Sequence, residues 1–431
     1  MKIGLVVEHF DPRRGGLEQW SWHFAQALLQ QGHQVHVICR SVAPEAAAIP
    51  MDCHQVPWGL NRLGFAEAVD QKLRQMDLDI IHDMGAGWYC DVFQPHWGSW
   101  LALAEQKLLL LPRWLRPWKR LVIRYLPRYR EIRRLLERQY RNDGRIFLAL
   151  SRQVAWDFQH FHGIQPEHIR VVYNGVDIRR FTPQNRSRYR GEIRRKFGLD
   201  EQTLVALIVA HNFRLKGAPS VIEAVRRLAA QGLPVHLLVV GGKRRPSTHQ
   251  ENGQSHSDGP VSFVGPVEDT APYYAAADVY VHPTLYDTFS LVVLEALASG
   301  LPVVTSRFNG VRELLHSEVE GYLVEDPLDP KELAGKIEIF CDPEIRAQMG
   351  RAARQLAEQH PFQKNVEEIL SVYEETLRRN LRGRCGNREG NRWGPFVCRR
   401  TCRPAMSAPA SGRPKPLQET QDGYRTRDRL F

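Results

Sequence analysis

The sequence predicts an α/β protein with two domains, each built on a parallel sheet covered by helices. Short apolar strands alternate with helix patterns from Ile3 onward, which is typical of repeated strand-helix-strand units. The alternation restarts at Thr203, after a turn at Asn174 and Gly175 that marks the crossing between domains. A length of 431 residues is enough for two or three domains with large cores.

The net charge of +11 is concentrated in two segments of the chain. Residues 113–141 contain eleven Lys or Arg and two acids, whereas residues 381–431 contain twelve and four. The remainder of the chain is therefore mildly acidic. No RNP, zinc-finger or helix-turn-helix pattern accompanies the basic residues, which leaves nucleic-acid binding as a minor alternative.

The cysteines and the apolar runs indicate the compartment. Seven scattered cysteines without a CxxC pair support neither a disulfide framework nor a zinc site. The chain opens on an apolar strand with no basic leader before it, and no run of 18 apolar residues occurs. We therefore expect a cytosolic protein.

Four apolar runs in the first half predict buried strands: Ile3–Val7, Val35–Cys39, Ile80–His82 and Ile146–Leu150. The first leads into Gly15 and Gly16 and then into a helix that ends at Gly32, while Ser151 caps a later helix. A glycine pair lets backbone approach a ligand closely, although by itself it is usually only a turn. His96 lies in another loop at a strand end, where a lone histidine is more often structural than catalytic.

The loop that follows the expected strand at 203–210 has the chemistry of an anion site. Arg214 and Lys216 precede Gly217 and the start of a helix that runs to about residue 230. Two cations beside a helix N-terminus can hold a diphosphate and stabilise the charge that develops on a leaving group. The alternative is an ordinary pair of surface cations.

The stretch from Asp278 to Ser306 places two carboxylates beside a helix start. Asp278–His282 predicts a buried strand, and Phe289–Ala298 predicts a helix that ends at Gly300. Asp287 lies before this helix and Glu295 lies eight residues later, so both can face one crevice and suit a polyhydroxylated ligand. The alternative is a helix cap and a solvated acid. The helix start offers backbone N–H donors from Thr288, Phe289, Ser290 and Leu291.

This stretch, with LEALASGLPVVTS after it, resembles the acid-x7-acid motif of retaining family 4 glycosyltransferases of the GT-B fold. NGVD at Asn174 and HNFRLKG before residue 218 also resemble that family, and the resemblance covers about residues 1–380. Two positions depart from the family pattern. The first acid is Asp287 instead of Glu, and Ser290 stands where the family has a small glycine.

The resemblance implies a role for each candidate. Asp287 would hold sugar hydroxyls, Glu295 the nucleotide ribose, and Arg214 with Lys216 the donor diphosphate. In many members the arginine lies five residues before the lysine, at the position of His211, so His211 and Arg214 are both candidates. Gly15 and Gly16 would open onto the crevice near the phosphate. His96 would lie near the reacting centre, with His82 as the reserve.

The resemblance also implies an architecture: two Rossmann-like domains that face a central cleft, with a C-terminal helix that crosses back. We expect an N-terminal acceptor domain at 1–175, a nucleotide-sugar domain at 176–361 and the crossover helix at 362–380. The segment 381–431 lacks periodicity and is expected to be a basic, disordered tail.

Residues 113–141 interleave aromatic side chains with arginines, and in the last part Tyr129, Ile132, Leu136 and Tyr140 form an apolar stripe. The segment predicts either a solvated helix or a surface for anionic lipid or a phosphorylated acceptor. The residues expected to form this surface are Arg113, Trp114, Arg116, Trp118, Lys119, Arg120, Arg130, Arg134, Arg138 and Arg141. The stretch from Phe93 to Trp114 also resembles the lipopolysaccharide core glucosyltransferase I branch, whose members work at the inner face of the membrane.

We therefore expect a retaining enzyme that moves a hexose from a nucleotide sugar to a saccharide acceptor such as lipopolysaccharide core. The branch favours glucose and a UDP-sugar, while GDP- and ADP-sugars remain open. No cofactor or metal is expected, because cations already lie on the phosphates. The alternatives are a sugar-nucleotide epimerase or hydrolase of the same fold, and a non-catalytic protein that binds membrane or nucleic acid.

Overall fold

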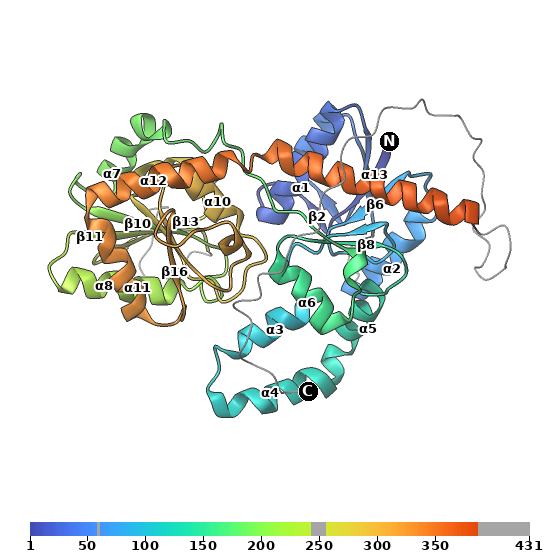
Figure 1. Cartoon of the computed structure of the whole chain (residues 1–431), viewed down its shortest axis with the longest axis horizontal. Coiled ribbons are helices and arrows are strands. Elements are labelled where there is room, and N and C mark those ends of the chain that lie inside the picture. Colours follow the sequence, from blue (N-terminus) through green and yellow to red (C-terminus); the bar gives the residue numbers. More distant parts are fainter. Residues whose placement is uncertain (58–60, 243–255, 387–431) are drawn as a thin grey trace. The chain divides into compact units, whose positions relative to one another are not determined.

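The computed structural model describes residues 1–57, 61–242 and 256–386 (Figure 1). Its N-terminal domain contains a parallel seven-stranded sheet in the order β5-β3-β1-β6-β7-β8-β9. The strands are β1 (Lys2–Val6), β3 (Gln34–Cys39), β5 (Asp52–Gln55), β6 (Ile80–Asp83), β7 (Val92–Phe93), β8 (Ile146–Ala149) and β9 (Ile169–Val171). The central strands are apolar throughout because helices cover both faces of a parallel sheet. A separate parallel pair joins β2 (His9–Phe10) to β4 (Ser41–Val42).

Six α-helices connect these strands. They are α1 (Gly16–Gln30), α2 (Arg62–Leu73), α3 (Trp100–Leu108), α4 (Arg116–Tyr125), α5 (Arg130–Gln139) and α6 (Arg152–His162). Short 3-10 turns lie at η1 (Pro44–Ala48), η2 (Arg113–Leu115), η3 (Pro127–Tyr129) and η4 (Pro166–His168). The expected cap is confirmed at α6, where the Ser151 hydroxyl accepts the Val154 N–H at 3.2 Å, and Gly163 ends the helix in the left-handed conformation.

The second domain has a sheet in the order β12-β13-β11-β10-β14-β15-β16. All its pairings are parallel except that of β12 with β13. The strands are β10 (Leu204–Val209), β11 (Val235–Val240), β12 (His256–Asp258), β13 (Val261–Gly265), β14 (Val279–His282), β15 (Val303–Ser306) and β16 (Gly321–Val324). The expected pair of parallel-sheet α/β domains is thus confirmed.

Helices also cover the second sheet. They are α7 (Gly191–Lys196), α8 (Ala218–Ala230), α9 (Ala271–Ala276), α10 (Leu291–Ala298), α11 (Pro330–Glu338) and α12 (Pro343–Glu358), with a π-helical turn η5 (Arg186–Arg190) and 3-10 turns η6 (Gly310–Glu313) and η7 (Ile339–Cys341). Helix α10 begins at Leu291, two residues later than the pattern predicts, because Ser290 is its N-cap with extended backbone.

Each sheet has one switch point where the strand order reverses. In the first sheet the chain runs outward from β1 to β5 and returns to β6 beside β1, and in the second it runs outward from β10 and returns to β14. Adjacent loops diverge at such a point and leave a crevice at the carboxyl ends of the strands, where ligands bind in open α/β sheets. The loops after β10 and β14 are those that carry the candidate cations and acids.

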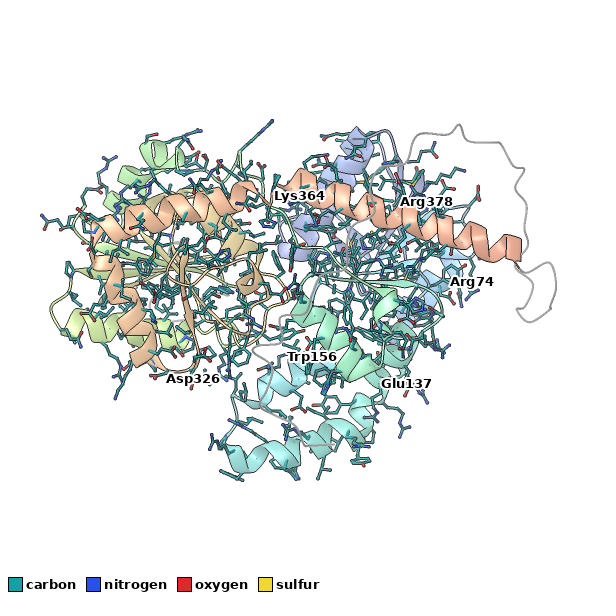
Figure 2. The ribbon with its side chains drawn as sticks, in the orientation of Figure 1. Arg74, Glu137, Trp156, Asp326, Lys364 and Arg378 are labelled. Atoms are coloured by element: carbon teal, nitrogen blue, oxygen red, sulfur yellow. The ribbon has the colours of Figure 1, made fainter. Side chains whose placement is uncertain are left out.

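The last helix, α13 (Phe362–Gly386), returns to the N-terminal domain as expected. Val366, Ile369 and Tyr373 join the buried cluster formed by β1, β3 and α1. Its outer face carries Lys364 and Arg378 (Figure 2). The helix continues to Gly386, six residues into the segment expected to be tail. The rest of the expected tail and residues 243–255, a polar stretch of the sequence between β11 and β12, lie outside the described residues.

Candidate active site

The loops after β10 and β14 are joined by backbone hydrogen bonds. Leu285 N–H donates to Leu215 O at 2.8 Å, and the Thr284 hydroxyl donates to the same oxygen at 3.2 Å. Gly217 makes this approach possible, because its φ is +76° and an added Cβ would lie 2.3 Å from Pro283 O. The loop that carries Lys216 is therefore held against the end of β14.

Asp287 is fixed by its own backbone. Its N–H donates to Phe308 O at 3.0 Å, and its carbonyl accepts the Gly310 N–H at 2.9 Å. The Asp287 carboxylate forms an ion pair with Lys216 Nζ and lies 3.6 Å from His282 Nε2. Burial alone would raise the pKa of Asp287, but Lys216 and His282 outweigh it and lower that pKa below its ordinary value. Asp287 is thus an anion at neutral pH, and it lies next to Lys216, a cation that can bind a phosphate.

Glu295 lies on α10, in a different environment from Asp287, which precedes the helix. Its carboxylate accepts the Tyr274 hydroxyl at 2.9 Å. Burial raises the pKa of Glu295 to about 7, against the opposing effects of Tyr274 and Arg180. The two acids therefore differ in protonation near neutral pH, a separation of pKa values that is common in functional sites.

The start of α10 offers free donors between the two acids. The Ser290 side chain makes no capping hydrogen bond, although Ser290 N–H approaches Asn309 Oδ1 at 3.4 Å. The Thr288 hydroxyl is engaged with His96 O at 2.6 Å, and the Phe289 ring stacks on Tyr173. The uncapped N-terminus at Leu291 can therefore donate N–H groups to an anion.

The glycine pair lies against this helix start. An added Cβ on Gly16 would be 3.5 Å from Leu291 Cδ1, whereas Gly15 is the extended N-cap of α1. Arg214 is exposed at the same crevice. His211 is also exposed and is close enough to Glu18 on α1 to lower the pKa of that carboxyl, which burial raises overall. Both candidates for the phosphate contact, His211 and Arg214, thus lie on the loop after β10.

The two histidines of the N-terminal domain have different surroundings. The His96 ring packs against Trp20 in a tilted arrangement with ring centroids 4.6 Å apart, and burial lowers the pKa of His96 to about 3. Its backbone carbonyl, bonded to Thr288, places it beside the acidic loop. His82 is fully buried and its Nδ1 lies 2.6 Å from the Tyr373 hydroxyl of α13. His96 is therefore the histidine beside the crevice, and His82 belongs to the core.

The sequence did not single out His282, the last residue of β14. Its Nδ1 lies 3.3 Å from the Tyr280 hydroxyl and its Nε2 faces Asp287. A polar residue that ends an apolar strand, DVYVH, just before the acidic loop is the signal that could have identified it. Neutral His282 with its proton on Nε2 would donate toward Asp287 and orient the carboxylate.

The basic segment folds as η2, α4, η3 and α5. The expected apolar stripe on its last part faces the core, because Leu136 and Tyr140 are buried with Phe147 and Phe158. The exposed large apolar side chains lie on η2, on α4 and directly after α4 instead, and among the described residues of this segment they are Trp114, Trp118, Leu121, Tyr125 and Leu126.

Several of the cations expected to form the membrane surface have partners within the protein. Arg116 donates to the carbonyls of Leu109 and Leu111, Arg120 pairs with Glu105, and Arg138 pairs with Glu67 and covers the Trp88 ring. Arg113, Arg130, Arg134 and Arg141 are exposed, and Lys119 is half-buried. None of the described helices is long and apolar enough to cross a membrane.

Each half of the chain matches a glycosyltransferase family model. Residues 14–180 match Glycosyltransferase Family 4, and residues 203–342 match Glycosyl transferases group 1. A D-inositol 3-phosphate glycosyltransferase of Corynebacterium kroppenstedtii is 30% identical over 269 residues, which are 60% of this chain and 59% of that protein. The enzyme of the same name from Pseudarthrobacter chlorophenolicus is 27% identical over 428 residues, 88% of this chain and 96% of that protein. The chain thus spans about three fifths of the first of these relatives.

Solved structures agree on the fold. WaaG, a glycosyltransferase involved in lipopolysaccharide biosynthesis, superposes with a TM-score of 0.70 at 22% identity, over 86% of this chain and 99% of that one. Anabaena HepE in complex with UDP-glucose superposes with a TM-score of 0.63 at 20% identity, over 86% and 100%. The chain therefore has the GT-B glycosyltransferase fold of group 1 and family 4.

Proposed function

We propose that this protein is a retaining hexosyltransferase that uses a nucleotide-sugar donor, with UDP-glucose as the first candidate. The observation that carries the proposal is the Lys216–Asp287 pair at the switch point of the second sheet, beside the uncapped start of α10. A sugar diphosphate has an anionic phosphate end and a sugar end that carries hydroxyl groups. A cation and an anion at the carboxyl ends of two neighbouring strands can bind these two ends.

Each group would then have one task. Transfer breaks the bond between the anomeric carbon and the diphosphate oxygen and forms a bond to the acceptor oxygen, whose proton passes to the departing diphosphate. Negative charge develops on the diphosphate as its bond to the sugar breaks. Lys216, with Arg214 or His211 and the α10 N–H groups, would stabilise that charge. Asp287 would accept hydrogen bonds from sugar hydroxyls, and Glu295 from the ribose. His96, neutral at pH 7, would contact the sugar or the acceptor.

The acceptor we propose is a saccharide of a cell-surface glycan, such as lipopolysaccharide core. This choice is supported by the exposed tryptophans at Trp114 and Trp118, which suit an enzyme that works at a lipid surface. The names of the curated relatives support a second candidate, D-inositol 3-phosphate. No metal is included in the proposal, because Lys216 and the helix N-terminus already supply positive charge to the phosphates.

The test is product analysis with purified full-length protein. UDP-, GDP- and ADP-glucose are each supplied alone, with core-truncated lipopolysaccharide, or with D-inositol 3-phosphate, and the products are identified by mass spectrometry and by the anomeric coupling in NMR. We expect an α-linked product from UDP-glucose and the lipopolysaccharide acceptor, with a rate unchanged by EDTA. A β-linked product would exclude retention, and free sugar or an epimer as the sole product would favour a hydrolase or an epimerase.

A further inference from the structure

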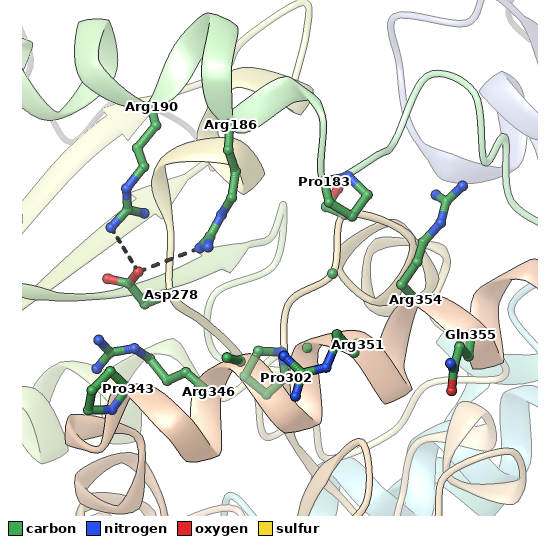
Figure 3. A pocket seen from close by; sticks show the side chains of 14 residues that line it. Pro183, Arg186, Arg190, Asp278, Pro302, Pro343, Arg346, Arg351, Arg354 and Gln355 are labelled. Carbon is green, nitrogen blue, oxygen red and sulfur yellow. Dashed lines mark ion pairs between the residues drawn. The ribbon is translucent and has the colours of Figure 1, made fainter.

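The second domain contains an arginine-lined cavity of about 570 Å3 that the proposed reaction does not use (Figure 3). One wall is the π-helical turn η5 with Arg186 and Arg190, and the opposite wall is α12 with Arg346 and Arg351. The floor includes Asp278, which precedes β14, and the turn between α10 and β15.

The cavity lies at the opposite end of the sheet from the candidate active site. Asp278 and Pro302 come directly before β14 and β15, at the amino ends of these strands, whereas Asp287 follows the carboxyl end of β14. A ligand here would therefore not be part of the donor site described above.

Positive charge in the cavity exceeds the negative charge that compensates it. Five arginines line it, and Asp278 is the one acid among its lining residues. Asp278 is already shared by Arg186, Arg190 and the buried Arg194. Burial is the largest cause that lowers the pKa of Arg186, and the neighbouring Arg190 is the second. An excess of nearby cations lowers the pKa of an arginine in the same direction.

Carboxylates outside the lining compensate only part of this excess. Glu201 pairs with Arg190 at 3.0 Å and Glu358 pairs with Arg354 at 2.7 Å. Within the described residues, Arg346 has only backbone carbonyls as acceptors, and no hydrogen bond or ion pair is formed by the exposed Arg351 side chain.

Two buried polar atoms of the lining also lack a partner among the described residues. They are the Ser299 hydroxyl, on a residue that is 97% buried, and Arg186 Nε. A buried hydroxyl and a buried guanidinium N–H without acceptors are costly, and both belong to residues that line the cavity.

We propose that this cavity binds a small, soluble, multiply charged phosphorylated molecule, held between the arginines of η5 and α12. Arginine binds phosphoryl oxygens through paired N–H groups, and the volume is in the range of small-molecule sites. None of the exposed large apolar side chains of the described residues lines the cavity, so it has no anchors for a lipid bilayer.

Calorimetry with the full-length protein and inorganic pyrophosphate as the probe tests the proposal at about 0.15 M ionic strength. The donor site can also bind pyrophosphate, so the set includes Lys216→Ala. The matched control is Arg188→Gln, which removes the same charge from η5 at a residue that does not line the cavity and whose guanidinium lies over Tyr189.

We expect binding in Lys216→Ala and Arg188→Gln to remain. Binding should weaken by about tenfold or more when the double variant Arg186→Gln/Arg351→Gln is made in the Lys216→Ala background, since charge-assisted hydrogen bonds are lost in the cavity. Undiminished binding in the double variant, or complete loss of binding in Lys216→Ala, would show that the cavity does not bind pyrophosphate. If circular dichroism shows that the double variant does not fold, the single variant Arg351→Gln tests the site, because the exposed Arg351 side chain forms no hydrogen bond or ion pair within the described residues. The measured quantity is pyrophosphate binding, so the result for this cavity does not depend on whether the protein transfers a glycosyl group.

Discussion

Lys216 Nζ and Asp287 Oδ2 form an ion pair although 71 residues separate them in the sequence. The pair exists because β10 and β14 are neighbours at the switch point, so the loops that follow them meet. Before a donor binds, each charge stabilises the other. A diphosphate would replace Asp287 as the partner of Lys216 and leave the carboxylate free for sugar hydroxyls.

The first prediction is that Lys216→Ala loses turnover while its fold is retained. Removal of one charge-assisted donor to the leaving diphosphate should cost on the order of 3 kcal/mol of transition-state stabilisation, which is about a hundredfold in kcat. Steady-state kinetics with UDP-glucose measures this loss. Lys331→Ala, which removes an exposed lysine on α11, is the control. Full turnover in Lys216→Ala would remove Lys216 from the mechanism.

The second prediction compares two glycines that both have positive φ. Gly217→Ala should destabilise the protein and reduce kcat, since its Cβ would lie 2.3 Å from Pro283 O and push the Lys216 loop away from β14. Gly232→Ala, at φ +86° with open space around it, should cost only about 1 kcal/mol of backbone strain and leave kcat intact. Thermal unfolding and kinetics of the two variants are compared. Equal effects would mean that the contact with Pro283 is unimportant.

The sequence predicts the two sheets because buried parallel strands are apolar and regularly spaced. It also identifies Asp287 and Lys216 separately, since each lies in a loop at a strand end. It does not pair them, because pairing depends on strand order. It likewise assigns the stripe with Leu136 and Tyr140 to a surface, since a helix that packs on the core and one that binds a membrane have the same periodicity. The arginine cavity could not be predicted, because Arg186 and Arg351 are distant in sequence.

The third prediction concerns pH and stability. Burial raises the pKa of Glu295 to about 7 in the folded state, so the folded protein holds this proton more tightly than the unfolded chain does. The contribution of Glu295 to stability is complete below its ordinary pKa of 4.5 and is lost as the pH rises through about 7. The loss is on the order of 3 kcal/mol.

Urea unfolding of wild type and Glu295→Gln at several pH values measures this contribution. The difference in unfolding free energy between the two proteins should change between pH 4.5 and 7 and then level off. Glu338→Gln replaces an exposed acid on α11, and its unfolding free energy should have the same pH dependence as that of the wild type. A pH-independent difference between wild type and Glu295→Gln would show that this carboxyl is not perturbed by folding.

The fourth prediction is that Glu295→Ala weakens donor binding. A carboxylate that accepts hydrogen bonds from the ribose contributes about 1.5–3 kcal/mol, which is roughly a tenfold to hundredfold increase in Kd. Calorimetric titration with UDP alone measures the loss without a need for turnover. Unchanged UDP affinity would move the ribose contact to another residue.

The membrane surface that we propose is centred on α4. Trp118 and Tyr125 on α4 are 64% and 66% exposed, and Trp114 on the preceding turn η2 is 76% exposed. Large apolar side chains are rarely left so exposed in a cluster unless they have a partner. Arg113 and Arg124 lie among them and are exposed, so they can attract an anionic surface. Each basic residue near such a surface contributes about 1 kcal/mol.

The last prediction is that this segment holds the protein reversibly on anionic membrane. Wild type should sediment with phosphatidylglycerol vesicles at low salt and be released at high salt, because the attraction is electrostatic in part. Trp114→Ala/Trp118→Ala should bind weakly, whereas Trp156→Ala, which removes an exposed tryptophan on α6, should bind like wild type (Figure 2).

A chain that ends at Gly386 should still bind to the vesicles. A further variant changes four arginines of α5 and its end to Gln: Arg130, Arg134, Arg138 and Arg141. It should bind less than wild type. If the shortened chain loses binding while the four-arginine variant keeps it, the membrane contact lies beyond Gly386 and not on this segment.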